Sequence, residues 1–191
     1  ASRGASILAT DLAGEDARSA SWLSTGQHCQ ATDDLYKPRL LSRELFDRRV
    51  SFQAVDMNAI PAELQGFDFC WSACALEHLG SLHRGLEFII NSLECLRPGG
   101  MTVHPTEFNL GSGEDTLETG PAVVYREKDI IEFSRKMRSL GHEIELNLNP
   151  GEHPLDKYVD AYCRGDVHLR LYVLNKVQAT SLGIVIRKSC A

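Results

Sequence analysis

The chain has 191 residues, of which 43% are hydrophobic and 24% charged, and this ordinary globular balance excludes an intrinsically disordered chain. Its net charge of −6 disfavours broad electrostatic binding to nucleic acids or anionic membranes, so we expect neither as a partner. No apolar run approaches the ~20 residues of a membrane span and no signal segment opens the chain, which predicts a cytoplasmic protein. The length suits a single domain over residues 1–191.

The first half of the chain predicts three strands, and two of them are closed by an acidic residue. Residues 5–10 are apolar and end at Asp11, which is typical of a buried strand. Leu35 to Phe46 favours a helix, and Val50 to Val55 predicts a second strand closed by Asp56. The aromatic-rich run 67–72 predicts a third strand.

The second half of the chain begins with the clearest helical period. Six apolar residues recur at steps of three and four and so share one helix face: Leu79, Leu82, Leu86, Ile89, Leu93 and Leu96. Arg97-Pro98-Gly99-Gly100 ends this helix and turns the chain into a strand over 101–104. The remaining expected elements are a helix over 129–140 and strands over 143–148 and 181–187. Strands that alternate with helices predict an α/β fold, a mainly parallel twisted sheet with helices on both faces.

Neither the cysteines nor the late loop has the spacing of a metal site. The six cysteines lie at 29, 70, 74, 95, 163 and 190, which favours buried reduced thiols over zinc ligands or disulfides. The loops at 109–122 and 149–168 are rich in Gly, Pro, Asp and Asn, and long loops often carry function. The second loop holds five potential ligands at irregular spacing, so we favour a solvated loop: Asn149, His153, Asp156, Asp160 and His168.

Four segments together resemble the class I S-adenosylmethionine-dependent methyltransferases. They are Ile7–Asp11, Val55–Met57, the pair 67–72 and Leu76–Leu79, and Leu96–Gly100, in that order. The resemblance extends from about Ala5 to Lys188. It implies a Rossmann-like fold, a transferase activity and S-adenosyl-L-methionine as the cofactor.

The resemblance also implies a set of cofactor-binding residues. Asp11 would accept both hydrogen bonds from the ribose hydroxyls, because a carboxylate at a strand end suits a diol. Asp56 would accept from the adenine amino group, and Met57 would pack on the ring. Ser72 and Ala73 would border the methionine part. An aspartate at a strand end is also a common helix cap or turn residue, and that alternative stays open here.

Two further residues are candidates for catalysis on a small-molecule or saccharide-type acceptor. His78 follows the third strand, where a histidine is suited to remove a proton from an oxygen or nitrogen nucleophile. Glu107 follows the fourth strand, and His104 and Asn109 are expected to line the same acceptor pocket. A purely structural role, in packing or helix capping, remains the alternative for each of them.

The chain departs from the family pattern at its start. The expected first strand and its glycine-rich loop have no counterpart before Ala5, and the one Gly-x-Gly, residues 111–113, lies after the fourth strand and is weak evidence. A missing central strand leaves two edges unpaired, which predicts residues beyond this sequence, a rearranged sheet, a homo-oligomer or a strand-donating partner. Two other functions therefore stay open: a non-catalytic remnant that acts as a partner-binding module, and a nicotinamide-dependent reductase, for which no Tyr-x-x-x-Lys pair is present.

Overall fold

The computed structural model describes residues 1–111, 114–160 and 169–190, and they fall into two compact units. The first unit is Ala1–Pro61 and the second is Ala62–Ala191. Within the described part of the chain, no helix has the length and apolar character needed to cross a bilayer.

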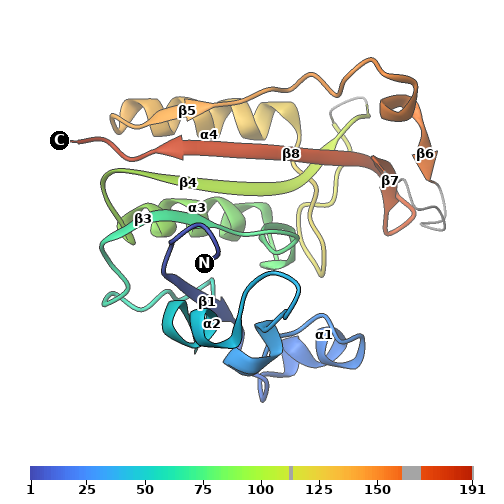
Figure 1. Ribbon diagram of the computed structural model, residues 1–191. Coiled ribbons are helices and arrows are strands. Elements are labelled where there is room, and N and C mark those ends of the chain that lie inside the picture. Colours follow the sequence, from blue (N-terminus) through green and yellow to red (C-terminus); the bar gives the residue numbers. More distant parts are fainter. Residues whose placement is uncertain (112–113, 161–168, 191) are drawn as a thin grey trace. The chain divides into compact units, whose positions relative to one another are not determined.

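The first unit is built on two parallel strands. Strand β1, Ile7–Asp11, pairs with β2, Val50–Ala54, residue for residue from Ile7 opposite Val50 to Asp11 opposite Ala54. Between them the chain forms η1 (Ala17–Ser19), α1 (Ala20–Ser24), η2 (Thr32–Leu35) and α2 (Arg43–Arg49), shown in blue to cyan in Figure 1. Both strands were predicted from their apolar runs, and both end at the same edge of their sheet.

The helix predicted over 35–46 is wrong in its bounds. The α-helix begins only at Arg43, because Ser42 is its N-cap and accepts a hydrogen bond from the Leu45 N–H. Pro38 stands upstream, and the residue before a proline is restricted away from helical geometry. Phe46 in α2 is nearly fully buried and lies against the Tyr36 ring at a centroid distance of 5.2 Å.

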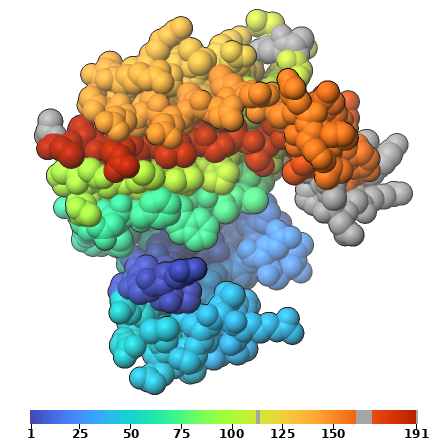
Figure 2. All heavy atoms as spheres, turned by 45° about the horizontal axis from the view of Figure 1, so that its top comes forward, coloured from blue at the N-terminus to red at the C-terminus, as the bar shows by residue number. Residues whose placement is uncertain are grey.

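The second unit contains a six-stranded sheet in which one strand opposes the rest. Its strands are β3 (Phe67–Trp71), β4 (Leu96–Asn109), β5 (Glu143–Glu145), β6 (Val159–Asp160), β7 (Arg170–Val173) and β8 (Val177–Arg187). Strands β3 and β4 are parallel, as are β6 and β7, while β8 is antiparallel to β4, β5 and β7. Strands β3 to β7 therefore run in one direction, and the mainly parallel α/β fold is confirmed. Figures 1 and 2 show β4 and β8 side by side as yellow-green and red bands.

Several elements of this unit have other bounds than predicted. Strand β4 starts at Leu96 and continues to Asn109, well beyond 101–104, because β8 pairs with it as far as Asn109. Strand β8 starts at Val177, and the strand predicted over 143–148 is limited to Glu143–Glu145. The short strands β6 and β7 were not predicted.

Helix α3, Leu82–Glu94, packs on one face of β4, and buried and partly exposed side chains alternate along that strand. This helix starts after Ser81, whose Oγ accepts from the Arg84 N–H, and helix α4 spans Glu127–Ser139. Short 3₁₀ helices, η3 (Leu76–His78) and η4 (Pro154–Lys157), complete the unit. Along β4 the buried positions are Thr102, His104, Thr106 and Phe108, and the partly exposed ones are Met101, Val103, Pro105 and Glu107. The two sets point to opposite sides of the sheet.

The thiols are free throughout the described residues, but their burial differs from the prediction. Cys95 is buried, Cys29 and Cys70 are half-buried, and Cys74 and Cys190 are exposed. Cys163 lies outside the described residues.

Candidate functional site

The two strand-end aspartates of the first unit lie at the same edge of its sheet. Asp11 is the last residue of β1 and stands opposite Ala54, and Asp56 follows two residues after Ala54. The Val55 N–H donates to the Asp11 carbonyl at 2.8 Å, so the backbone of β2 stays beside Asp11 up to the turn that holds Asp56. The parallel register thus brings together two carboxylates that are 45 positions apart in the sequence.

Three protein groups contact the Asp11 carboxylate. Its Oδ1 accepts from the Leu12 N–H at 2.8 Å, and its Oδ2 accepts from the Cys29 N–H at 2.9 Å. The His28 Nδ1 lies 2.9 Å from the same Oδ2, and the His28 side chain is only 1% exposed. His28 was not among the predicted site residues, because nothing in its sequence neighbourhood indicates that it meets β1.

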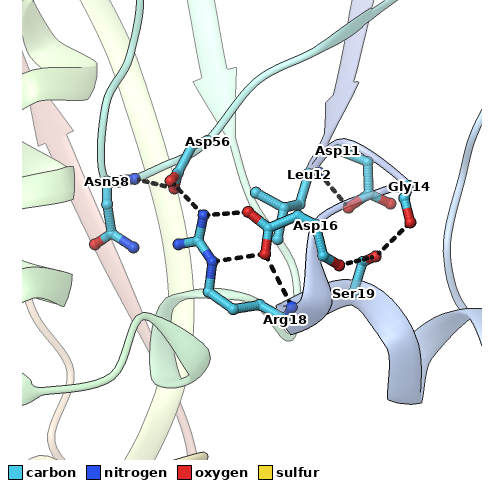
Figure 3. A network of polar contacts seen from close by, with 8 residues as sticks. All are labelled: Asp11, Leu12, Gly14, Asp16, Arg18, Ser19, Asp56 and Asn58. Atoms are coloured by element: carbon cyan, nitrogen blue, oxygen red, sulfur yellow. Dashed lines mark hydrogen bonds and ion pairs between the residues drawn. The ribbon is translucent and has the colours of Figure 1, made fainter.

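Asp56 lies in a charged network with Arg18 and Asp16, shown in Figure 3. Arg18 Nη2 donates to Asp56 Oδ2 at 2.7 Å, and the Asn58 N–H donates to Asp56 Oδ1 at 2.8 Å. Burial alone raises the pKa of Asp56, but the hydrogen bonds from Arg18 and Asn58 outweigh it, so the pKa lies below its usual value. Asp56 is therefore an ionised acceptor at neutral pH.

Met57 follows Asp56 in the chain, and a pocket of the first unit lies beside the two residues whose N–H groups bind Asp11, although neither aspartate lines it. Met57 is half-buried in the turn that the Ala59 N–H closes on the Asp56 carbonyl at 2.9 Å. The pocket, of about 400 Å³, lies beside the segment that follows Asp11. Its lining residues are Leu12, Ala13, Gly14, Glu15, Cys29, Gln30, Phe52 and Ala54. A volume of this size falls in the range of small-molecule sites.

In the second unit, Ser72 and Ala73 follow directly on the end of β3. The Ser72 N–H donates to the Val103 carbonyl at 3.2 Å, which holds the end of β3 beside β4. Ala73 is exposed. Cys74 has a φ of 49°, a left-handed conformation that is uncommon for a residue other than glycine. The segment after β3 therefore has a specific, strained backbone course, of the kind that often accompanies ligand sites.

His104 does not line a pocket, which corrects the prediction. It is 1% exposed and lies on the α3 side of β4, whereas Glu107, three residues on, lies on the other side. Its Nδ1 contacts the Ser72 Oγ at 2.9 Å, and its Nε2 contacts the Ser92 Oγ at 3.1 Å and the Thr102 hydroxyl. Burial lowers the pKa of His104 to about 4, so a neutral ring ties β3 to α3 and β4.

His78 and Glu77 form a pair in η3. The His78 Nδ1 is 2.7 Å from the Pro121 carbonyl oxygen and must donate to it, which leaves Nε2 as the basic nitrogen of the neutral ring. That Nε2 lies 3.8 Å from Glu77 Oε1. Glu77 is 4% exposed, and burial raises its pKa. The histidine is about a quarter exposed, so a small molecule has access to it.

Glu107 is the second carboxyl group of this region. It is half-buried on β4, and its pKa is raised to about 7 by burial and, secondarily, by the charge of Glu77. The same two glutamates raise the pKa of the Cys74 thiol, after burial itself. Glu77, Glu107 and Cys74 therefore lie within electrostatic reach of one another, and Glu107 titrates near the pH at which a general base is most effective.

Other candidates have structural partners. Asn109 is 8% exposed, accepts from the Gly111 N–H and donates to the Asp115 carbonyl, so it closes a turn and does not line a pocket. In the late loop, His153 and Asp156 cap η4 through reciprocal hydrogen bonds. His168, and residues 112–113 of the Gly-x-Gly segment, lie outside the described residues. Among the residues that are described, no group of three or more potential ligands is placed to hold a metal.

The architecture of the chain is similar to that of several solved structures. A structure of S-adenosylmethionine-dependent methyltransferases from Methanosarcina mazei aligns with 100% of this chain and 85% of its own, at 14% identity and a TM-score of 0.53. TehB from Haemophilus influenzae aligns over 97% and 51%, at 17% identity and a TM-score of 0.52. The chain has the class I methyltransferase fold.

The methyltransferase fold is shared by proteins that carry out other reactions. The [4+2]-cyclase SpnF aligns with 98% of this chain and 76% of its own, at 15% identity and a TM-score of 0.50. No protein-family model matches the sequence, and no curated protein matches it significantly. The chain spans about half of TehB and 43% of the methyltransferase SibL. The fold therefore sets the positions of the strand-end residues, and the reaction has to be argued from those residues.

Proposed function

We propose that the chain is a methyltransferase domain that uses S-adenosylmethionine to methylate a small-molecule acceptor. The observation that carries this proposal is the pair of aspartates, Asp11 and Asp56, at the ends of two adjacent parallel strands. In an α/β sheet, ligands bind outside the carboxyl ends of the strands, and carboxylates there accept hydrogen bonds from a nucleoside. The fold, shared with methyltransferases at 14–17% identity, agrees with this assignment.

The residues of the first unit fit the adenosine part of the cofactor. In the proposed complex, Asp11 accepts from the ribose hydroxyls, and its three protein contacts hold the carboxylate in one orientation. Asp56, ionised at neutral pH, accepts from the adenine amino group, while Met57 packs on the ring. Ser72 and Ala73 line the methionine part. When bound, S-adenosylmethionine supplies a methyl group on a sulfonium, an electrophile that needs an oriented nucleophile.

On the acceptor side, His78 and Glu107 are the proposed proton-accepting residues. The hydrogen bond from His78 Nδ1 to Pro121 selects the tautomer whose Nε2 receives a proton. Glu77, next to this Nε2, stabilises the imidazolium that forms. Glu107 is a second base whose pKa of about 7 suits proton transfer at neutral pH.

The test is calorimetric titration with S-adenosylhomocysteine, supported by a thermal-unfolding series. Binding is expected to raise the free energy of unfolding by about 2.7 kcal/mol at a ligand concentration of 100 Kd. Homocysteine and adenosine alone serve as matched partial ligands and are expected to bind more weakly. No heat and no shift in Tm at millimolar S-adenosylhomocysteine would refute the assignment.

A partner-binding module without catalysis is the second candidate. It is favoured by β3, which among the described residues pairs with β4 alone and exposes about half of Phe69 and two thirds of Trp71. An open strand edge with apolar side chains is a site for pairing with a further strand. The same titration separates the candidates, because a remnant module does not bind S-adenosylhomocysteine.

A further inference from the structure

Glu77 is a buried carboxyl group that is only partly satisfied by the protein. Its Oε2 is buried and has no hydrogen-bond partner among the described residues, and its Oε1 is 3.8 Å from His78, beyond hydrogen-bond distance. The donor that acts on the carboxyl group is the backbone N–H of Glu77 itself. No lysine or arginine of the described chain forms an ion pair with it. A buried carboxylate without donors is costly, and each such group in a native structure calls for an explanation.

Glu107, on β4, is less buried, and within the described residues neither of its carboxyl oxygens is a buried atom without a partner. Its carboxyl group accepts no hydrogen bond from the described residues, although it is half-buried. The segment 123–125 lies against both residues. The Val123 N–H donates to the Glu77 carbonyl at 3.0 Å, and the Tyr125 N–H donates to the Glu107 carbonyl at 2.9 Å. In agreement with this proximity, the charge of Glu77 contributes to the raised pKa of Glu107. Of the basic groups in this region, Arg126 pairs with Asp129 and Glu118, and His78 donates its Nδ1 proton to the Pro121 carbonyl.

Two neighbouring carboxyl groups that receive no side-chain hydrogen bond from the described residues are complementary to a cation that carries several N–H groups. We propose that Glu77 and Glu107 bind the nitrogen of an amine, and that the acceptor of the proposed methyltransferase is therefore a primary or secondary amine. This inference rests on the proposed function. A protonated amine donates to both carboxylates and offsets their mutual repulsion, whereas a hydroxyl donates once and brings no charge.

In the proposed transfer, Glu107 accepts a proton from the amine and Glu77 pairs with the positively charged nitrogen. The bound ammonium passes one proton to the Glu107 carboxylate, which exposes the nitrogen lone pair. That pair forms the new N–C bond while the bond from the methyl carbon to the sulfonium sulfur breaks, and its electrons remain on sulfur as a thioether. The charge that leaves sulfur thus appears on the methylated nitrogen, which again pairs with Glu77. The substrate nitrogen is positively charged and paired with Glu77 both before and after the methyl transfer, so Glu77 is a binding residue. Glu107 binds the nitrogen as well, and it also accepts the proton.

The experiment compares matched amines and alcohols by calorimetry, with and without saturating S-adenosylhomocysteine. The probes are 2-phenylethylamine against 2-phenylethanol, and glucosamine against glucose. We expect the amine of at least one pair to bind about tenfold more tightly than its alcohol. We expect the Glu77→Gln and Glu107→Gln variants to lose that preference while they bind S-adenosylhomocysteine within twofold of the unchanged protein. Glu87→Gln, an exposed glutamate of α3, is the matched control and keeps the preference.

The outcomes separate the two proposals. Equal binding of amines and alcohols, or a preference that survives in both variants, overturns the amine assignment and leaves the cofactor proposal standing. Failure of S-adenosylhomocysteine to bind overturns the proposed function. The titrations without S-adenosylhomocysteine then decide the amine site alone, because the carboxyl pair belongs to the second unit. A circular-dichroism melt of each variant excludes unfolding as the cause of lost binding.

Discussion

The strand-end aspartates of the first unit and the glutamates of the second differ in what surrounds them. Asp11 and Asp56 each accept at least two hydrogen bonds from protein groups, and half-burial does not prevent the pKa of Asp56 from falling. Glu77 and Glu107 receive no hydrogen bond from another described residue, and burial raises the pKa of both. The side chains are carboxyl groups in both units. The hydrogen-bond donors around Asp56 stabilise its ionised form, whereas burial favours the protonated form of Glu77 and Glu107.

The two pairs of carboxyl groups differ in where their hydrogen-bond donors come from. In the first unit each aspartate receives one hydrogen bond from the backbone N–H of a residue that closely follows it, Leu12 for Asp11 and Asn58 for Asp56, which a strand-end turn provides. Around Glu77 the backbone supplies only the N–H of Glu77 itself, and burial outweighs it, so the pKa is raised. A pair of that kind destabilises the protein without its ligand, which is typical of functional positions.

The largest expected effect comes from Asp11. Asp11→Asn removes the charge that the proposed ribose hydroxyls contact, so we expect the affinity for S-adenosylhomocysteine to fall about 30- to 100-fold, or roughly 2–3 kcal/mol. Calorimetric titration measures this. Asp47→Asn, an exposed aspartate that pairs with Arg43, is the control. Binding of the Asp11 variant within threefold of the unchanged protein contradicts the ribose role.

Glu107→Gln is expected to stabilise the protein at alkaline pH. The raised pKa of Glu107 means that the folded state keeps a proton between pH 4.5 and about 7 that the unfolded state has lost. Stability therefore falls as the pH rises through this window, and a glutamine abolishes that loss. Urea unfolding is expected to show a gain of about 1–2 kcal/mol at pH 8, discounted for partial exposure, and none at pH 4. Identical pH profiles for the variant and the unchanged protein contradict this account.

His28 provides a smaller test of how Asp11 is held. His28→Ala removes the side-chain contact on Asp11 Oδ2, and we expect about 1 kcal/mol less stability and a roughly fivefold weaker affinity for S-adenosylhomocysteine. His28→Asn retains a donor and is expected to recover most of the affinity. If both variants bind alike, His28 serves packing alone.

The smallest effect is expected at Arg18. This side chain is about half exposed, so Arg18→Ala is expected to change the free energy of unfolding by no more than about 0.5 kcal/mol. The pKa of Asp56, followed by NMR titration, is expected to rise because its strongest donor is lost. A stability loss above about 1 kcal/mol shows that the network has a larger structural role.

Much of this fold was predictable from local patterns. The apolar runs that end at Asp11 and before Asp56 are strands, and their acidic ends mark one edge of a sheet, because parallel strands end together. The helix over 129–140 was also found within two residues, as Glu127–Ser139, owing to its regular period. The long β4 and the strands β6 and β7 were not predictable, because their extent depends on pairing with β8.

The site was predictable only where chain position determines orientation. The buried side of His104 follows from alternation along β4, but which side α3 covers is a property of the assembled unit. The burial of the Glu77 carboxyl group likewise depends on residues that are distant in the sequence. His28 carries no local signal for its contact with Asp11. Sequence patterns thus located strand ends well and side-chain environments poorly.

The position of β8 has a consequence for folding during synthesis. It comes last in the chain among the described strands, yet it pairs with both β4 and β5, so neither of these two strands can form its hydrogen bonds to β8 until Arg187 has been synthesised. The sheet of the second unit therefore stays open between β4 and β5 until β8 has been synthesised. Such non-local closure is slow and leaves strand edges available for aggregation, so chaperone dependence is expected to depend on how quickly the final eleven-residue strand inserts.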